Sequence, residues 1–129
     1  MDIGVPAEIK TAEKRIGLTP GATNELTSLG HKVVIQSGAG TGAGYEDSSY
    51  QEAGASIVSS AQEVFDSSEM IVKVKEPQSV ERAMLQPHHI LFTYLHLAAD
   101  KPQTDELLDS KATCIAYETV TDDAGRLPL

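Results

Sequence analysis

Several polar side chains follow short apolar runs, at the points where buried strands are expected to end. Lys75 follows one run, Tyr94 and His96 follow a second, and Glu118 follows a third. Parallel strands end at a common edge, and open α/β sheets bind ligands outside that edge. We therefore expect these side chains to meet at the carboxyl edge of one sheet. Arg15 joins them if the first strand is parallel to the others.

The residue types at this edge suit a small carboxylate ligand. Arg15 offers a planar fork of N–H donors and Lys75 a point charge. His96 supplies an imidazole, a side chain that can donate a proton to a carbonyl oxygen and take it back. The ordinary alternatives are a lysine in a solvated loop and a histidine that packs beside its neighbours Leu95 and Leu97.

A glycine-rich stretch, residues 38–44, fits the G-x-G-x-x-A pattern of dinucleotide sites. That pattern requires a helix that opens directly at the glycines and a carboxylate at the end of the next strand. The first helix signal comes later, at Asp47, which we expect to cap the helix, and the next strand ends in Ser59 and Ser60. The sequence favours a plain loop, and no cofactor-binding residue is expected in this chain.

The positions of the histidines and the cysteine in the sequence do not predict a metal site or a reactive thiol. His88 and His89 are adjacent, and adjacent residues do not normally converge on one ion; no Cys-x-x-Cys or His-x-x-x-His pattern accompanies them. No metal ligand is therefore expected. Cys114 lies within an apolar run, which is typical of an inert core thiol.

The elements that must position these groups are short apolar runs separated by helix signals. Thr19-Pro20 and Gly30 bracket one predicted helix, and Ser60 with Glu63 has capping-box spacing for another. Mostly continuous apolar runs predict strands covered on both faces. The pattern indicates an α/β fold in three layers, with a mostly parallel twisted sheet, flavodoxin-like in the broad sense. The expected strands are residues 3–5, 32–36, 56–58, 70–74, 90–94 and 113–117.

Length and charge narrow the class of protein. The chain has 129 residues, enough for one domain, and its 10 Lys and Arg against 19 Asp and Glu give a net charge of −9. Such a charge disfavours nucleic acid and acidic membrane surfaces as partners. The start carries no basic leader, and no apolar run approaches the ~20 residues of a spanning helix, so we expect a cytoplasmic protein.

Six stretches of the chain form a specific combination. They are Ile-Gly-Val-Pro-Ala-Glu-Ile-Lys from position 3, Glu-Lys-Arg-Ile-Gly-Leu-Thr-Pro from position 13, Lys-Val-Lys-Glu-Pro from position 73, Leu-Phe-Thr-Tyr-Leu-His-Leu-Ala from position 91, Ala-Tyr-Glu-Thr from position 116, and Leu-Pro-Leu at 127–129. Together they resemble the N-terminal substrate-binding domain of alanine dehydrogenase. The related α-subunit of proton-translocating nicotinamide nucleotide transhydrogenase shares the layout, but Lys75-Glu76-Pro77 and the stretch around His96 are more similar to the dehydrogenase.

The resemblance implies NAD-dependent oxidation of L-alanine to pyruvate and ammonia, and the reverse reaction. It implies that Arg15 and Lys75 hold the substrate carboxylate, that His96 is the acid/base, and that Tyr94 and Glu118 lie nearby. Residues 1–129 would form the substrate-binding domain, while the NAD-binding Rossmann domain is not encoded in this chain. The chain alone would then be inactive, would not bind NAD tightly and would need that domain or the C-terminal part as partner, in a homo-oligomer.

Two other interpretations stay open. One is a fragment of the transhydrogenase α-subunit. The other is a non-catalytic module that binds small carboxylates or drives oligomerisation.

Overall fold

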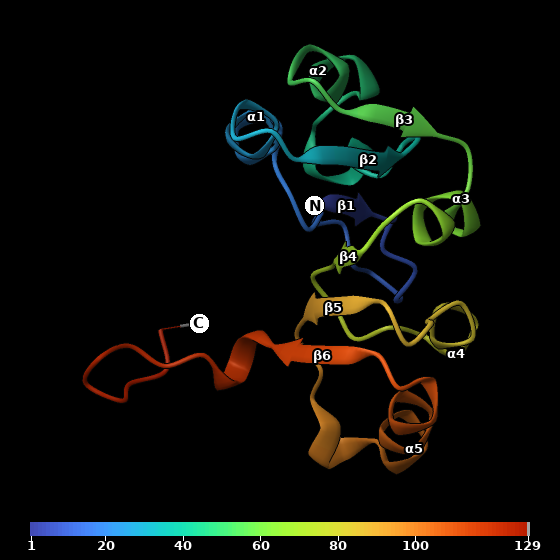
Figure 1. Cartoon of the computed structure of the whole chain (residues 1–129), viewed down its shortest axis with the longest axis vertical. Coiled ribbons are helices and arrows are strands. Elements are labelled where there is room, and N and C mark those ends of the chain that lie inside the picture. The colour runs from blue at the N-terminus through green and yellow to red at the C-terminus, as the bar shows by residue number, and fades with distance from the viewer. Residues whose placement is uncertain (129) are drawn as a thin grey trace.

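Six parallel strands form one sheet in the order β3-β2-β1-β4-β5-β6 (Figure 1). This computed structural model describes residues 1–128, so Leu129, the end of the expected Leu-Pro-Leu match, lies outside the described residues. All six predicted strands are present, three of them one or two residues shorter than expected. They are β1 (Asp2–Val5), β2 (Lys32–Gln36), β3 (Ser56–Val58), β4 (Met70–Val72), β5 (Ile90–Thr93) and β6 (Thr113–Ala116).

Helices cover the two faces of the sheet unequally. In Figure 1, α1 and α2 lie on one side and α3, α4 and α5 on the other, which confirms the three-layer α/β class. Short 3₁₀ turns η1, η2 and η3 join some of the elements. The helices are α1 (Pro20–Ser28), α2 (Asp47–Glu52), α3 (Ala61–Asp66), α4 (Ser79–Arg82) and α5 (Lys101–Ser110), and the turns are Thr41–Ala43, Leu97–Ala99 and Tyr117–Thr119.

Local sequence signals explain where the helices begin and end. The Thr19 side chain accepts from the backbone N–H of Ala22 at the start of α1, and α3 opens with the predicted Ser60–Glu63 capping box. The expectation that Asp47 caps α2 was wrong. Glu46 is the cap residue, and the Asp47 carboxylate instead accepts from the Ser37 hydroxyl (2.7 Å) and from the backbone N–H of residue 38 (2.8 Å).

The strand order makes the sheet doubly wound. From β1 the chain moves outward to β2 and β3, then returns to the other side of β1 and continues through β4, β5 and β6. The sequence predicts a flavodoxin-like sheet only in the broad sense, without a strand order. The structure shows the six-stranded order 3-2-1-4-5-6. Adjacent crossovers leave β1 and β4 toward opposite faces, which opens a crevice between their carboxyl ends.

Two apolar clusters, one on each face, hold the sheet in place. Ile35 and Tyr50 are fully buried in the cluster under α1 and α2, while Phe65 and Leu91 are fully buried in the cluster under α3 and α5. Among residues 1–128, no helix covers the α1 side of β5 and β6, where Ile115 is 40% exposed. No helix within this described part is long and apolar enough to cross a bilayer.

Candidate active site

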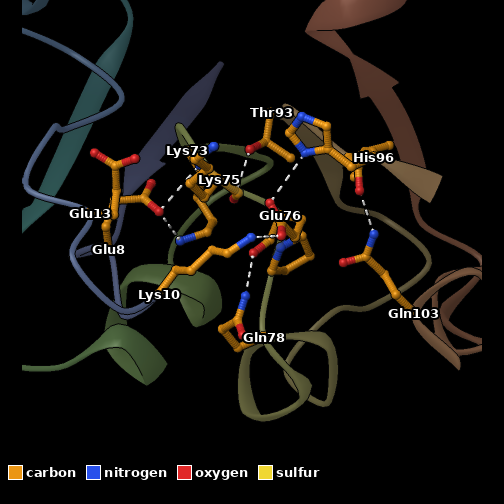
Figure 2. A network of polar contacts seen from close by, with 12 residues as sticks. Glu8, Lys10, Glu13, Lys73, Lys75, Glu76, Gln78, Thr93, His96 and Gln103 are labelled. Atoms are coloured by element: carbon orange, nitrogen blue, oxygen red, sulfur yellow. Dashed lines mark hydrogen bonds and ion pairs between the residues drawn. The ribbon is translucent and has the colours of Figure 1, made fainter. Parts of the chain in front are cut away.

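The carboxyl edge of the sheet gathers the segments that follow β1, β4, β5 and β6. Because all six strands are parallel, their ends point to one side, and Arg15, Lys75, Tyr94, His96 and Glu118 all lie in segments that leave there. Strand geometry alone therefore accounts for the meeting of segments far apart in the sequence. Figure 2 shows part of the polar network that joins these segments.

Arg15 lines an open cavity of about 540 Å³, whose other walls include the aromatic side chains of Tyr94 and Tyr117. Its guanidinium pairs with Glu13, with Nε 2.9 Å from Oε1 and Nη2 2.6 Å from Oε2. These bonds use two of the five guanidinium N–H groups. The side chain remains 62% exposed, so donors are left for a ligand in the cavity.

The Arg15–Glu13 pair is held in its charged form. The hydrogen bond from the Arg15 side chain is the main cause that lowers the pKa of Glu13 to about 2. The same bond raises the pKa of Arg15. Glu13 thus orients the guanidinium and stays an acceptor at any pH near neutrality.

His96 stands exposed at the end of the β5 segment. Its backbone adopts a left-handed conformation with φ 52°, and its N–H donates to Glu118 at 2.7 Å, beside a second bond from Leu95. The imidazole stacks on Tyr94, with ring centroids 5.8 Å apart and planes 14° apart. Its Nδ1 lies 3.4 Å from a carboxylate oxygen of Glu76. The structure therefore brings Tyr94, His96 and Glu118 together.

The backbone bonds also set the ionisation of Glu118. Burial raises its pKa, but the N–H groups of His96 and Leu95, with a charge contribution from His96, outweigh burial and lower the pKa below its usual value. His96 and Glu118 line a second hollow of about 440 Å³. Glu118 thus hydrogen-bonds to the His96 backbone rather than to its ring.

Lys75 is half-buried, and its backbone is fixed on both sides. Its N–H lies 3.3 Å from Glu8 Oε2, and its carbonyl accepts from the Thr93 hydroxyl at 2.9 Å. In the described part of the chain, Lys75 is not among the residues that line either hollow. The structure places it on the predicted edge, one residue from Glu76, but apart from the aromatic cavity of Arg15.

A buried ion cluster supports this loop, and sequence reasoning missed it. The Lys73 side chain is 1% exposed, and its Nζ lies 3.2 Å from Glu8 Oε2 and 2.7 Å from Glu81 Oε1. Glu8 also accepts from the N–H of Val74 at 2.6 Å, and thereby ties the end of β1 to the loop after β4. The available signal was a lysine between two valines at the end of a buried strand.

The residues at the switch point do not fit a dinucleotide. In this strand order a pyrophosphate would sit in the turn after β1, on a helix N-terminus. Here that turn holds the Glu8 carboxylate, and α1 begins only at Pro20. The glycine-rich loop is no substitute, because the Asp47 carboxylate already accepts from the N–H of Gly38. Among residues 1–128, no His, Cys, Asp and Glu side chains group so that they could hold a metal ion.

Fold and site together define a doubly wound α/β domain with cationic groups, a histidine and an aromatic cavity at its carboxyl edge. The family model "Alanine dehydrogenase/PNT, N-terminal domain" matches residues 4–129. The chain belongs to this family.

Individual relatives agree with the family model. The chain is 51% identical to the alanine dehydrogenase of Halomonas elongata over 129 residues and 48% identical to that of Bacillus subtilis over 130 residues. Both matches include 100% of this chain, but only 35% and 34% of the length of the two relatives. The chain thus spans about a third of the curated relatives it matches.

Solved structures show the same relation. An L-alanine dehydrogenase structure superposes with a TM-score of 0.96 at 48% identity, over 99% of this chain and 35% of the other. A transhydrogenase from Sinorhizobium meliloti superposes with a TM-score of 0.85 over 92% of this chain and 35% of the other, at 22% identity. The second likeness shows the shared fold alone.

Proposed function

We propose that residues 1–129 are the substrate-binding domain of an NAD-dependent alanine dehydrogenase, which interconverts L-alanine and pyruvate with release or uptake of ammonia. The observation that carries the proposal is that Arg15, Lys75 and His96 lie in segments that leave the same carboxyl edge of the sheet. The identity of about half the residues with alanine dehydrogenases supports it.

Each of the three residues has a distinct task in this proposal. The free N–H groups of Arg15 and the ammonium of Lys75 bind the substrate carboxylate, which fixes the reacting carbon relative to the edge. The His96 imidazole takes a proton from the substrate nitrogen or from an added water molecule, and returns it in the reverse direction. Tyr94 confines the imidazole from one face.

In this proposal, NAD is bound by a domain other than this one. The turn after β1 carries Glu8 where an anion would sit, so the nicotinamide would be held by a domain outside this chain. We also expect the whole protein to be a homo-oligomer, since exposed apolar surface such as that around Ile115 tends to be covered by further chain or by partners.

Calorimetric titration of the chain with pyruvate tests the carboxylate site. We expect binding by the wild type, and binding weakened about tenfold or more in Arg15→Ala and in Lys75→Ala, because a hydrogen bond to a charged group contributes about 1.5–3 kcal/mol. Lys32→Ala removes an equally charged residue, 82% exposed, at the opposite edge of the sheet and is expected to bind normally. No binding by the wild type, or equal affinity in all variants, would contradict the proposal.

Turnover assays separate the domain assignment from the binding site. The chain alone is expected to show no NAD-dependent alanine oxidation, and measurable turnover would contradict the placement of the NAD site outside it.

A transhydrogenase fragment is the second candidate, because the family covers both proteins and one transhydrogenase shares the fold. Capture of an NADP(H)-binding partner subunit together with absent pyruvate binding would favour it. Pyruvate binding without activity in the full-length protein would favour a non-catalytic module.

A further inference from the structure

Glu76 occupies a singular place among the carboxylates of the edge, because its two oxygens join two other segments. One oxygen forms an ion pair with Lys10, from the segment after β1, and the other lies 3.4 Å from His96 Nδ1, in the segment after β5 (Figure 2). Its own carbonyl accepts from the Gln78 side chain at 2.9 Å, which fixes the loop. The side chain is only 14% exposed.

The charge state of Glu76 decides what it can offer to the imidazole. Burial raises its pKa, but the hydrogen bond from Lys10 and further bonds, including one from His96, outweigh burial and bring the pKa below its usual value. Near neutral pH the group is therefore a carboxylate, which accepts hydrogen bonds and donates none.

The imidazole meets Glu76 with a defined edge. Its backbone is tied to Glu118 through the 2.7 Å bond from the His96 N–H, and its ring lies nearly parallel to the ring of Tyr94. With Nδ1 turned toward Glu76, Nε2 lies on the other side of the ring. Within residues 1–128 no hydrogen bond engages Nε2.

A neutral imidazole carries one proton, and the hydrogen bond at one nitrogen decides which nitrogen holds it. An acceptor-only carboxylate at Nδ1 favours the proton there and leaves the lone pair on Nε2. We propose that Glu76 is a positioning residue that selects this tautomer of His96, with Lys10 holding Glu76 in place. The inference rests on the proposed acid/base role of His96 and names Nε2 as the atom that exchanges the substrate proton.

Nitrogen-15 NMR of the histidine rings reports the tautomer directly and needs neither substrate nor turnover. The spectrum is recorded at pH 8, where an ordinary imidazole is neutral. Another histidine of the chain, His89, serves as the reference for the tautomer. His89 Nδ1 accepts from the N–H of Gln86 at 2.9 Å, and Nε2 faces the Phe65 carbonyl at 3.0 Å, so His89 carries its proton on Nε2. We expect His96 to show the opposite pattern, with the proton on Nδ1.

Glu76→Gln gives the sharper of two variants. Lys10 retains the carbonyl oxygen of the new amide, so the NH₂ group faces His96 and makes Nδ1 an acceptor. We therefore expect the proton of His96 to move to Nε2. Glu76→Ala removes both partners and is expected to give a mixture of tautomers. Glu25→Gln, an exposed glutamate on α1, serves as the matched control and is expected to leave His96 unchanged.

Because an unfolded histidine also favours the Nε2–H form, cooperative unfolding in urea, rather than the His89 pattern, verifies that each variant is folded. A wild-type His96 with its proton on Nε2, or a His96 pattern in Glu76→Gln identical to the wild type, would overturn the inference. These outcomes are distinct from failure of the proposed function, which is scored separately by pyruvate binding.

Discussion

Two groups of charged residues lie on the same edge of this sheet and differ in nearly every physical respect. Around Lys73, a lysine and two glutamates are 1–2% exposed and bond mainly to one another and to backbone. Around Arg15 and His96, side chains are 62% and 48% exposed and retain unused donors and acceptors. The buried cluster fixes the loops, and the exposed residues are left available for a ligand.

The difference shows how one edge can be both rigid and reactive. Both carboxylate oxygens of Glu8 accept hydrogen bonds, from the Lys73 side chain and from the backbone N–H groups of Val74 and Lys75. Glu8 is therefore not available to a ligand, but it fixes the position of the Lys75 backbone. Arg15 and His96 need such support because neither is packed in the core. If this division is correct, substitutions in the buried cluster change stability, and substitutions among the exposed residues change binding.

Lys73→Met carries the largest expected effect. It leaves Glu8 and Glu81 buried without their shared cation, and breaking a buried ion pair by removing one partner costs about 3–5 kcal/mol. Urea unfolding of the chain measures this loss. Lys101→Met is the control, since Lys101 is 83% exposed and pairs with Asp105 on the surface of α5, where such a pair contributes about 0.3–0.5 kcal/mol. Equal losses in the two variants would contradict the division.

A second prediction concerns His89, which belongs to the buried side of the comparison although it lies far from the edge. Burial is the main cause that lowers the pKa of His89, so the folded chain takes up a proton at this ring at a lower pH than the unfolded chain does. The unfolded chain takes up a proton near pH 6.5, so stability falls as pH drops from about 7 toward 5, by up to about 1.4 kcal/mol per pH unit.

Denaturant unfolding at pH 7.5 and pH 5.5 checks this sign. His89→Gln loses the bonds to Gln86 and Phe65, so it is expected to be less stable than the wild type at the higher pH. Its stability is nevertheless expected to depend less on pH over this interval. A wild type that gains stability on acidification would show that His89 is not held neutral.

The sequence predicted the sheet well because its strands are short apolar runs between clear helix signals. It also predicted that Arg15, Lys75 and His96 share an edge, because parallel strands require this. It could not predict the buried cluster or the role of Glu76. Glu8 lies 65 residues from Lys73, and Glu76 lies 20 residues from His96, so these contacts depend on strand order and register, which no local pattern encodes.

Arg15→Ala carries the smallest expected effect on stability and so tests the exposed side of the comparison. The Arg15 side chain is 62% exposed, although that of Glu13 is only 8% exposed, and an ion pair with an exposed partner contributes about 0–1 kcal/mol. The free energy of unfolding measured in urea is therefore expected to fall by less than about 1 kcal/mol. The same variant is expected to bind pyruvate about tenfold or more weakly than the wild type. A loss of stability as large as that of Lys73→Met would place Arg15 among the supports of the fold, since a residue whose main task is to bind a ligand contributes little to the folded state without one.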